Sequence, residues 1–221
     1  MSDEKRGFLS QAWGCLTSPR GTMGSIQGGD LRKGAALILV LALISAWAGY
    51  VYASKLPLEL PEQSRHTGFG PIISPGALRR SLMTISAVRD GLRVITGWLI
   101  PSVLLHLFTS LRERGSLRRM LALTGFTSIP LILQKALRLL DAYVISGEAI
   151  LSIIEAQAPG RNLALQLVRE VSTVFTVFGL WAFALTIVAA SINYRTSTMK
   201  AAAATSSAYL AFILLRLLLP I

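Results

Sequence analysis

The feature that most constrains this chain is a run of residues at 34–53 that contains no charge, GAALILVLALISAWAGYVYA. A helix of about 20 apolar residues is long enough to cross the hydrocarbon core of a bilayer. Arg32 and Lys33 precede the run, and aromatic residues such as Trp47 gather toward its end, as they do at membrane interfaces. The run therefore predicts a transmembrane helix.

Four further runs extend this pattern along the chain. We predict five transmembrane helices, at about 34–53, 94–111, 120–140, 171–192 and 201–219. Gln134, Lys135 and Arg138 interrupt the third run, and we expect their long side chains to reach the membrane interface. The helical pattern then continues to about Gln157. Residues 77–93 repeat apolar residues at helical spacing among arginines, which predicts either a helix on the membrane surface or an entry to the second span.

The composition excludes an ordinary soluble domain. The 221 residues are 52% apolar and 15% charged, whereas soluble domains carry about 25% charged residues. A domain of this length buries too little surface to hide so many apolar side chains. The predicted fold class is therefore an all-α membrane protein, with five transmembrane helices at 34–221 and short amphipathic surface helices at 1–33.

The net charge of +11 would also suit a nucleic-acid-binding protein. The basic residues, however, lie in short segments between apolar runs, which is typical of topology signals, so no nucleic acid is expected. The signals on one side are Lys5, Arg6, Arg20, Arg32, Lys33, Arg112, Arg114, Arg118, Arg119, Arg195 and Lys200. We predict the cell (cytoplasmic) membrane as the location, with the amino terminus inside and the carboxyl terminus outside.

The amino-terminal residues predict two short helices at the cytoplasmic face. Apolar side chains recur at helical spacing before Ser18, which can cap a second helix that has Pro19 at its first position. The alternative is a mobile tail, because short helices are marginal alone. The expected contacts with the membrane surface or a partner are Phe8, Leu9, Trp13, Leu16, Arg20, Arg112, Arg114, Arg118 and Arg119.

Small residues and prolines predict how the spans pack. Small side chains spaced by four let helices approach closely, either inside one bundle or between protomers of an oligomer, and internal packing is the interpretation we favour. Two prolines are expected to kink their spans. The residues concerned are Ser45, Gly49, Ala203, Ser207 and Ala211 for packing, and Pro101 and Pro130 for kinks.

No motif in the sequence points to catalysis. A phosphate-binding loop, a dinucleotide fingerprint and paired metal ligands are all missing, so we expect no enzyme, no cofactor and no metal site. Cys15 is the only cysteine and is interpreted as an apolar filler, with palmitoylation or redox sensing as alternatives. His106 is a polar residue inside a span. We expect it to bond to a serine or carbonyl of a neighbouring helix, the alternative being a functional polar site.

Three segments carry a resemblance to a known family. They are LTSPRGTMGSI followed by LRKGAALILVLALISAWAGYVYASK, then GWLIPSVLLHLFTSLRERGSLRRMLALTGFTSIPLIL, then GLWAFALTIVAASINYRTSTMKAAAATSSAYLAFILL. From about Leu16 to Leu215 the chain resembles the Yip domain family of multi-pass membrane proteins, in its prokaryotic branch. The resemblance implies five spans, an inside amino terminus and an outside carboxyl terminus. Eukaryotic members are associated with Rab-type GTPases, but their Asp-Leu-Tyr-Gly-Pro motif is absent from this sequence.

Two functions follow as expectations. The first is an integral membrane scaffold or adaptor of the Yip-like type, which touches anionic headgroups and recruits a protein partner at the cytoplasmic face. The alternative is a small permease or channel subunit that uses the proline-kinked spans and His106. The lack of acidic residues inside the clean spans counts against ion-coupled transport.

Overall fold

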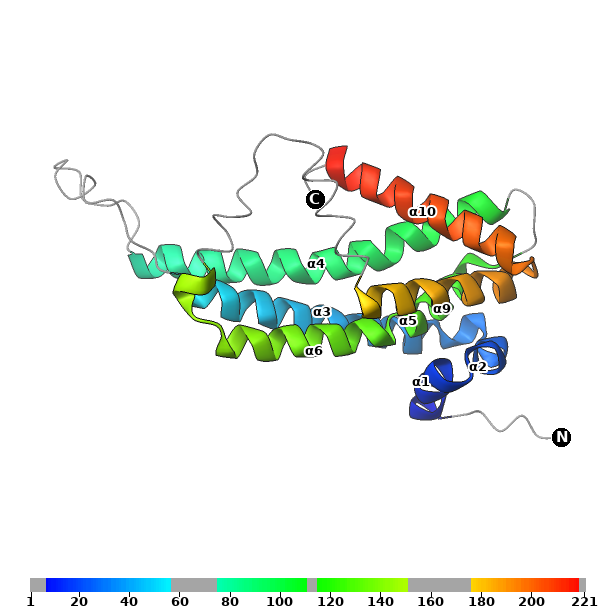
Figure 1. Cartoon of the computed structure of the whole chain (residues 1–221), viewed down its shortest axis with the longest axis horizontal. Helices are drawn as coiled ribbons and strands as arrows, with labels where there is room; N and C mark the ends of the chain where they lie inside the picture. Colours follow the sequence, from blue (N-terminus) through cyan, green and yellow to red (C-terminus); the bar gives the residue numbers. More distant parts are fainter. Residues whose placement is uncertain (1–6, 57–74, 111–114, 151–175, 219–221) are drawn as a thin grey trace.

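The computed structural model describes residues 7–56, 75–110, 115–150 and 176–218. Within these ranges every regular element is a helix (Figure 1). The elements are α1 (Phe8–Thr17), α2 (Pro19–Ser25), the 3-10 helix η1 (Gly28–Asp30), α3 (Leu31–Ser54), α4 (Pro75–Ser110), α5 (Leu117–Thr127), α6 (Ile129–Val144), α9 (Val177–Tyr194) and α10 (Thr198–Leu218). The all-α class and the short amino-terminal helices agree with the sequence.

Four of these helices, α3, α4, α9 and α10, are each long and apolar enough to cross a membrane. A fifth candidate is the pair α5 and α6, which together pass the same test but are bent by 41° at a short break. The chain is therefore a multi-pass membrane protein, with four spans among the described residues, or five when the bent pair is counted as one.

The helix α4 joins two segments that the sequence left separate. Residues 77–93 and the second predicted span belong to one 36-residue helix, which includes all but the last residue of that span. At 1.5 Å per residue such a helix is about 54 Å long, well beyond the hydrocarbon thickness of about 30 Å. Of the two alternatives for 77–93, the structure therefore shows the entry to the span. Pro101 lies inside α4, and the helix continues past it.

The third span is not the continuous helix that we expected. It breaks at Ser128, whose hydroxyl donates to the Gly125 carbonyl at 2.6 Å. Pro130 follows in the first turn of α6, where its missing N–H removes a bond that would continue the helix. The bend thus arises at a break before Pro130 rather than at a kink within a helix. The helix α6 ends at Val144, so the continuation expected up to Gln157 is interrupted; after a break at residues 145–146 the chain is helical again at 147–150, and residues 151–157 lie outside the described ranges.

The last two spans lie close to their predicted places. The helix α9 runs to Tyr194, two residues beyond the predicted end, and residues 171–175 of that prediction are not described. Arg195 ends α9 in the left-handed conformation, with φ of 51°. The short turn after it leads into α10, which returns across α4 (Figure 1).

The centre of the bundle is α3, which packs against α4, α5 and α6. Ser45 and Gly49 are buried on it, and a Cβ on Gly49 would lie 2.6 Å from the Asp90 carboxylate of α4. These two small residues therefore pack inside the bundle.

The small-residue stripe of α10 is different. Ala203 and Ser207 are exposed and Ala211 is half-buried, which corrects the internal packing that we favoured for them. The buried residues of α10 are Ala201, Thr205, Ala208 and Phe212. The face that packs is therefore rotated around the helix, and it combines small residues other than the predicted ones with the large Phe212 side chain.

Candidate functional site

The residues 8–30 form a compact unit, the N-terminal platform, which consists of α1, α2 and η1. Ser18 separates the two α-helices and Pro19 begins the second, as predicted. The Ser18 side chain makes no capping bond, which differs from the prediction; its N–H instead bonds to the Gly14 carbonyl at 2.8 Å. Gly14 itself packs so closely on Thr22 that the two helices form a tight elbow.

The platform is fastened to the membrane helices by both apolar and polar contacts. Cys15, Met23 and Ile26 are fully buried and belong to the hydrophobic core of the whole bundle. Arg119 of α5 donates from Nε to the Ile26 carbonyl at 2.9 Å and from its terminal nitrogen to the Gly24 carbonyl at 3.1 Å. Bonds from a charged donor are the stronger kind, so Arg119 holds the end of α2 in place.

The apolar side chains predicted for one face of α1 divide between two environments. Leu9 and Trp13 are 79% and 69% exposed. Leu16 packs against the core, and Phe8 lies against Phe126 with ring centroids 6.3 Å apart. The platform therefore turns Leu9 and Trp13 outward while the rest of its apolar surface anchors it.

Basic residues surround this end of the bundle. Arg20 donates to the Thr198 hydroxyl at 3.4 Å, which ties α2 to the start of α10. Lys33 pairs with Asp30 at 2.8 Å and donates to Gln11 at 3.0 Å. Arg118 is exposed. Figure 1 shows the platform, the end of α9 and the start of α10 at the same end of the molecule. Two predicted contact residues, Arg112 and Arg114, lie outside the described ranges.

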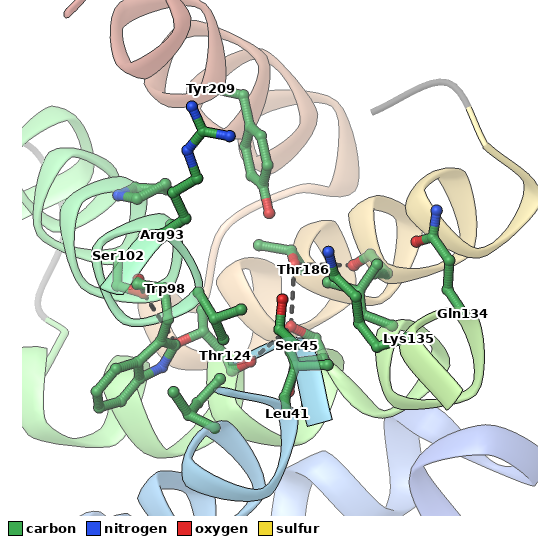
Figure 2. A pocket seen from close by; sticks show the side chains of 18 of the residues that line it. Leu41, Ser45, Arg93, Trp98, Ser102, Thr124, Gln134, Lys135, Thr186 and Tyr209 are labelled. Carbon is green, nitrogen blue, oxygen red and sulfur yellow. Dashed lines mark hydrogen bonds between the residues drawn. The ribbon is translucent and has the colours of Figure 1, made fainter. Parts of the chain in front are cut away.

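A second feature, which the sequence did not reveal, is a cavity of about 520 Å³ inside the bundle. Residues of α3, α4, α5, α6, α9 and α10 all line it, so it exists only once these helices have packed (Figure 2). Ser45 and Pro101, singled out above as packing and kink residues, both face this space. Pro101 has no N–H and leaves the carbonyl of Gly97, another lining residue, without its intrahelical donor.

Hydroxyl groups form a bonded network along one side of the cavity. The Ser102 and Thr124 hydroxyls lie 2.9 Å apart, and the Trp98 indole N–H donates to Thr124 at 3.1 Å. Thr127 and Thr186 join α5 to α9 through hydroxyls 3.1 Å apart. These bonds fix five polar side chains in one arrangement.

Cations line the cavity in greater number than acids. Arg93, Lys135, Arg138 and Arg216 are among its lining residues, with Asp90 as the one carboxylate among those described. From the sequence we expected Gln134, Lys135 and Arg138 to reach the membrane interface, whereas all three line this cavity. The signal that could have found the cavity was the recurrence of basic residues near the ends of several apolar runs.

Comparison with known families decides the relationship of this chain. The family model for the Yip1 domain matches residues 13–219. This chain belongs to the Yip1 domain family. The match begins within α1 and extends beyond the end of α10, so most of the platform and the whole described bundle lie inside it. No curated protein and no solved structure matches the chain.

In this Yip1 domain protein His106 is engaged with a neighbouring helix. Its Nδ1 lies 2.9 Å from the hydroxyl of Tyr194, a fully buried residue at the end of α9. The partner is a tyrosine rather than the serine or carbonyl that we expected. His106 is not among the residues that line the cavity.

Cys15, the one cysteine of this Yip1 domain protein, lies where the N-terminal platform contacts the membrane helices. Burial removes solvent from the Cys15 thiol and raises its pKa to about 12, so the thiol stays neutral at physiological pH. A neutral buried thiol is a weak nucleophile. The environment therefore matches the apolar filler, and palmitoylation or redox sensing would first require the platform to open.

Proposed function

We propose that this Yip1 domain protein is an integral membrane scaffold or adaptor that recruits a protein partner through its N-terminal platform. In this proposal the platform faces the cytoplasm at the cell membrane, and the carboxyl terminus lies outside. The side chains that make the contact are Leu9 and Trp13, with Phe8 and Leu16 supporting them from the anchored side.

The observation that carries the proposal is the contrast in solvent exposure between the two sides of the platform. Its inner surface is fully buried at Cys15, Met23 and Ile26, while Leu9 and Trp13 remain 79% and 69% exposed on a helix that is held in place. Large apolar side chains displayed on an ordered surface are the usual anchors of protein contacts, and tryptophan is prominent among them. An ordered platform also loses little conformational entropy when a partner binds.

The basic residues around the platform support a second part of the proposal, contact with anionic headgroups. Arg20, Arg118 and Arg195 lie on this end of the bundle. A basic residue near an anionic leaflet contributes about 1 kcal/mol of attraction. Such contacts orient the platform on the membrane and present Leu9 and Trp13 at its surface.

A permease or channel subunit is not proposed. That alternative relied on His106, which is bonded to Tyr194 and stands apart from the cavity. Nothing among the described residues favours a transport path through it.

The test is co-purification of partners from native membranes with a Leu9→Ala and Trp13→Ala double variant. We expect the partner to be lost, while a Met199→Ala control retains it, because Met199 is 85% exposed at the same end of the bundle but outside the platform. Equal recovery with the double variant and the wild type would contradict the proposal.

A further inference from the structure

The bundle cavity has a chemistry that the scaffold role does not use. We propose that it binds the phosphate group of an anion, either the headgroup of an anionic phospholipid or a free phosphate compound. Lys135 is its principal contact, and Arg138 and Arg93 complete the cationic side.

The charges of the side chains that line the cavity favour an anion as its ligand. Four lining side chains are cationic and one is a carboxylate among the described residues. The carboxylate of that one, Asp90, lies 3.6 Å from the Arg89 guanidinium, which is not a lining residue. The cavity therefore keeps an excess of positive charge, which repels a metal ion or an organic cation and attracts a phosphate.

Lys135 is the lining cation that is least compensated. Its ammonium has no hydrogen bond or ion pair with any residue in the described ranges, and the repulsive charges of Arg138 and Arg93 outnumber the one attractive charge nearby, the Asp90 carboxylate. A cation held among packed helices is costly unless an opposite charge compensates it. A bound phosphate would provide that charge.

Arg138 is positioned beside the same space but is partly used elsewhere. Its guanidinium lies 5.5 Å from the centre of the Tyr52 ring, which orients the side chain without neutralising it. Asp141, three residues along the same helix, accepts a hydrogen bond from Tyr52 at 2.5 Å and forms no ion pair with Arg138. Arg138 therefore keeps its charge available for an anion.

Neutral donors face the cations across the cavity. Figure 2 shows the Tyr209 hydroxyl, the Lys135 ammonium and the Ser45 hydroxyl turned toward one space from three different helices. Phosphate oxygens accept several hydrogen bonds at once, and hydroxyl and ammonium groups are among their usual donors. The arrangement thus offers a phosphate both charge and directional bonds.

The remaining wall is apolar, with Ile38, Leu41, Val94 and Leu131 among its residues. A volume of about 520 Å³ lies within the range of about 300–1,000 Å³ that is usual for ligand sites. It accommodates a headgroup together with the first part of an acyl chain. Cationic and aliphatic surfaces in one cavity therefore suit a phospholipid as well as a smaller phosphate compound.

The experiment compares lipids bound to the full chain by native mass spectrometry after extraction from vesicles of phosphatidylglycerol mixed with phosphatidylcholine. The test variant is Lys135→Met combined with Arg138→Met, which removes charge without adding polar groups. The control is Arg80→Met, because Arg80 is exposed on α4 and does not line the cavity. A charge-retaining variant, Lys135→Arg, and thermal unfolding of every variant show whether a loss reflects binding or folding.

We expect the wild type, the control and Lys135→Arg to retain phosphatidylglycerol, and the neutral double variant to lose about tenfold in retention. A second arm adds inorganic phosphate. If phosphate displaces the lipid, or binds in the absence of lipid, and this effect is lost in the neutral double variant, the ligand of the cavity is a free phosphate compound. That result supports the proposed site equally. Retention by the folded neutral variant that equals the wild type, together with no effect of phosphate, would overturn the proposal. Equal retention of phosphatidylcholine and phosphatidylglycerol by the wild type would also overturn the lipid source.

Discussion

Gly34 of α3 and Gly125 of α5 meet at their backbones. A Cβ on Gly125 would lie 2.5 Å from the Gly34 Cα, and a Cβ on Gly34 would lie 2.6 Å from the Ala122 carbonyl oxygen. The crossing therefore has room for hydrogen atoms only. It brings the start of the first span against the helix that carries Arg119, and so sets the position of the platform.

Replacing Gly125 with alanine should destabilise the protein, because the added methyl group meets backbone that cannot move aside. We expect a loss of about 1–3 kcal/mol, the range for overpacking a dense core. Thermal unfolding in detergent measures it. The control is Gly24→Ala in α2, where a Cβ meets no atom within 4 Å, and this variant should be neutral or slightly stabilised. Equal stability of both variants would contradict the close crossing.

The bond between His106 and Tyr194 should be measurable by a double-mutant cycle. Tyr194→Phe removes only the hydroxyl and leaves the buried ring packed, so the His106 nitrogen loses its partner. We expect a coupling of about 1 kcal/mol between Tyr194→Phe and His106→Phe in unfolding free energy. Additive effects of the two substitutions would show that the residues do not bond.

Cys15 should resist thiol reagents in the folded protein. Because its pKa is raised to about 12, the reactive thiolate at pH 8 is only about one part in ten thousand, and labelling should rise only as pH approaches that value. The measurement is maleimide modification in native membranes. A Ser10→Cys variant in a Cys15→Ala background serves as the control, since Ser10 is exposed on the same helix. Equal labelling of Cys15 and this control would show that the thiol is accessible.

Arg119 should decide whether the platform stays docked. Arg119→Met removes both bonds to the carbonyls at the end of α2 while leaving an apolar stem, and each such charged bond contributes about 1.5–3 kcal/mol. Amide hydrogen exchange at residues 20–25 of α2 should become about tenfold faster or more. Arg118→Met removes the same charge from an exposed neighbour and should leave exchange unchanged. A similar effect of both variants would point to charge rather than to the bonds.

The sequence predicted the spans because an uncharged run such as 34–53 has few other stable environments. It also predicted the platform helices from their apolar spacing and from Pro19. It did not predict the break at Ser128, because the apolar pattern continues through it and only the bond to Gly125 reveals the change. The cavity was equally hidden, since Lys135 and its neighbours meet only through packing of helices far apart in sequence.

The stripe of α10 shows a related limit of sequence reasoning. Ala203 and Ser207 have the spacing of a packing face, but the buried residues are Ala201, Thr205, Ala208 and Phe212. In a helix that is rich in alanine several faces satisfy the small-residue rule. Which face packs depends on where the large side chains of neighbouring helices lie, and the sequence of α10 alone does not contain that information.

The most direct test of the central claim is site-specific photocrosslinking in native membranes from position 13, with a photoreactive amino acid in place of Trp13. The same probe at position 199 is the control, because Met199 is exposed at the same end but lies outside the platform. The scaffold proposal predicts a discrete protein adduct from position 13 that is absent from position 199. Adducts to lipid alone from position 13, or the same protein adducts from both positions, would contradict recruitment through the platform.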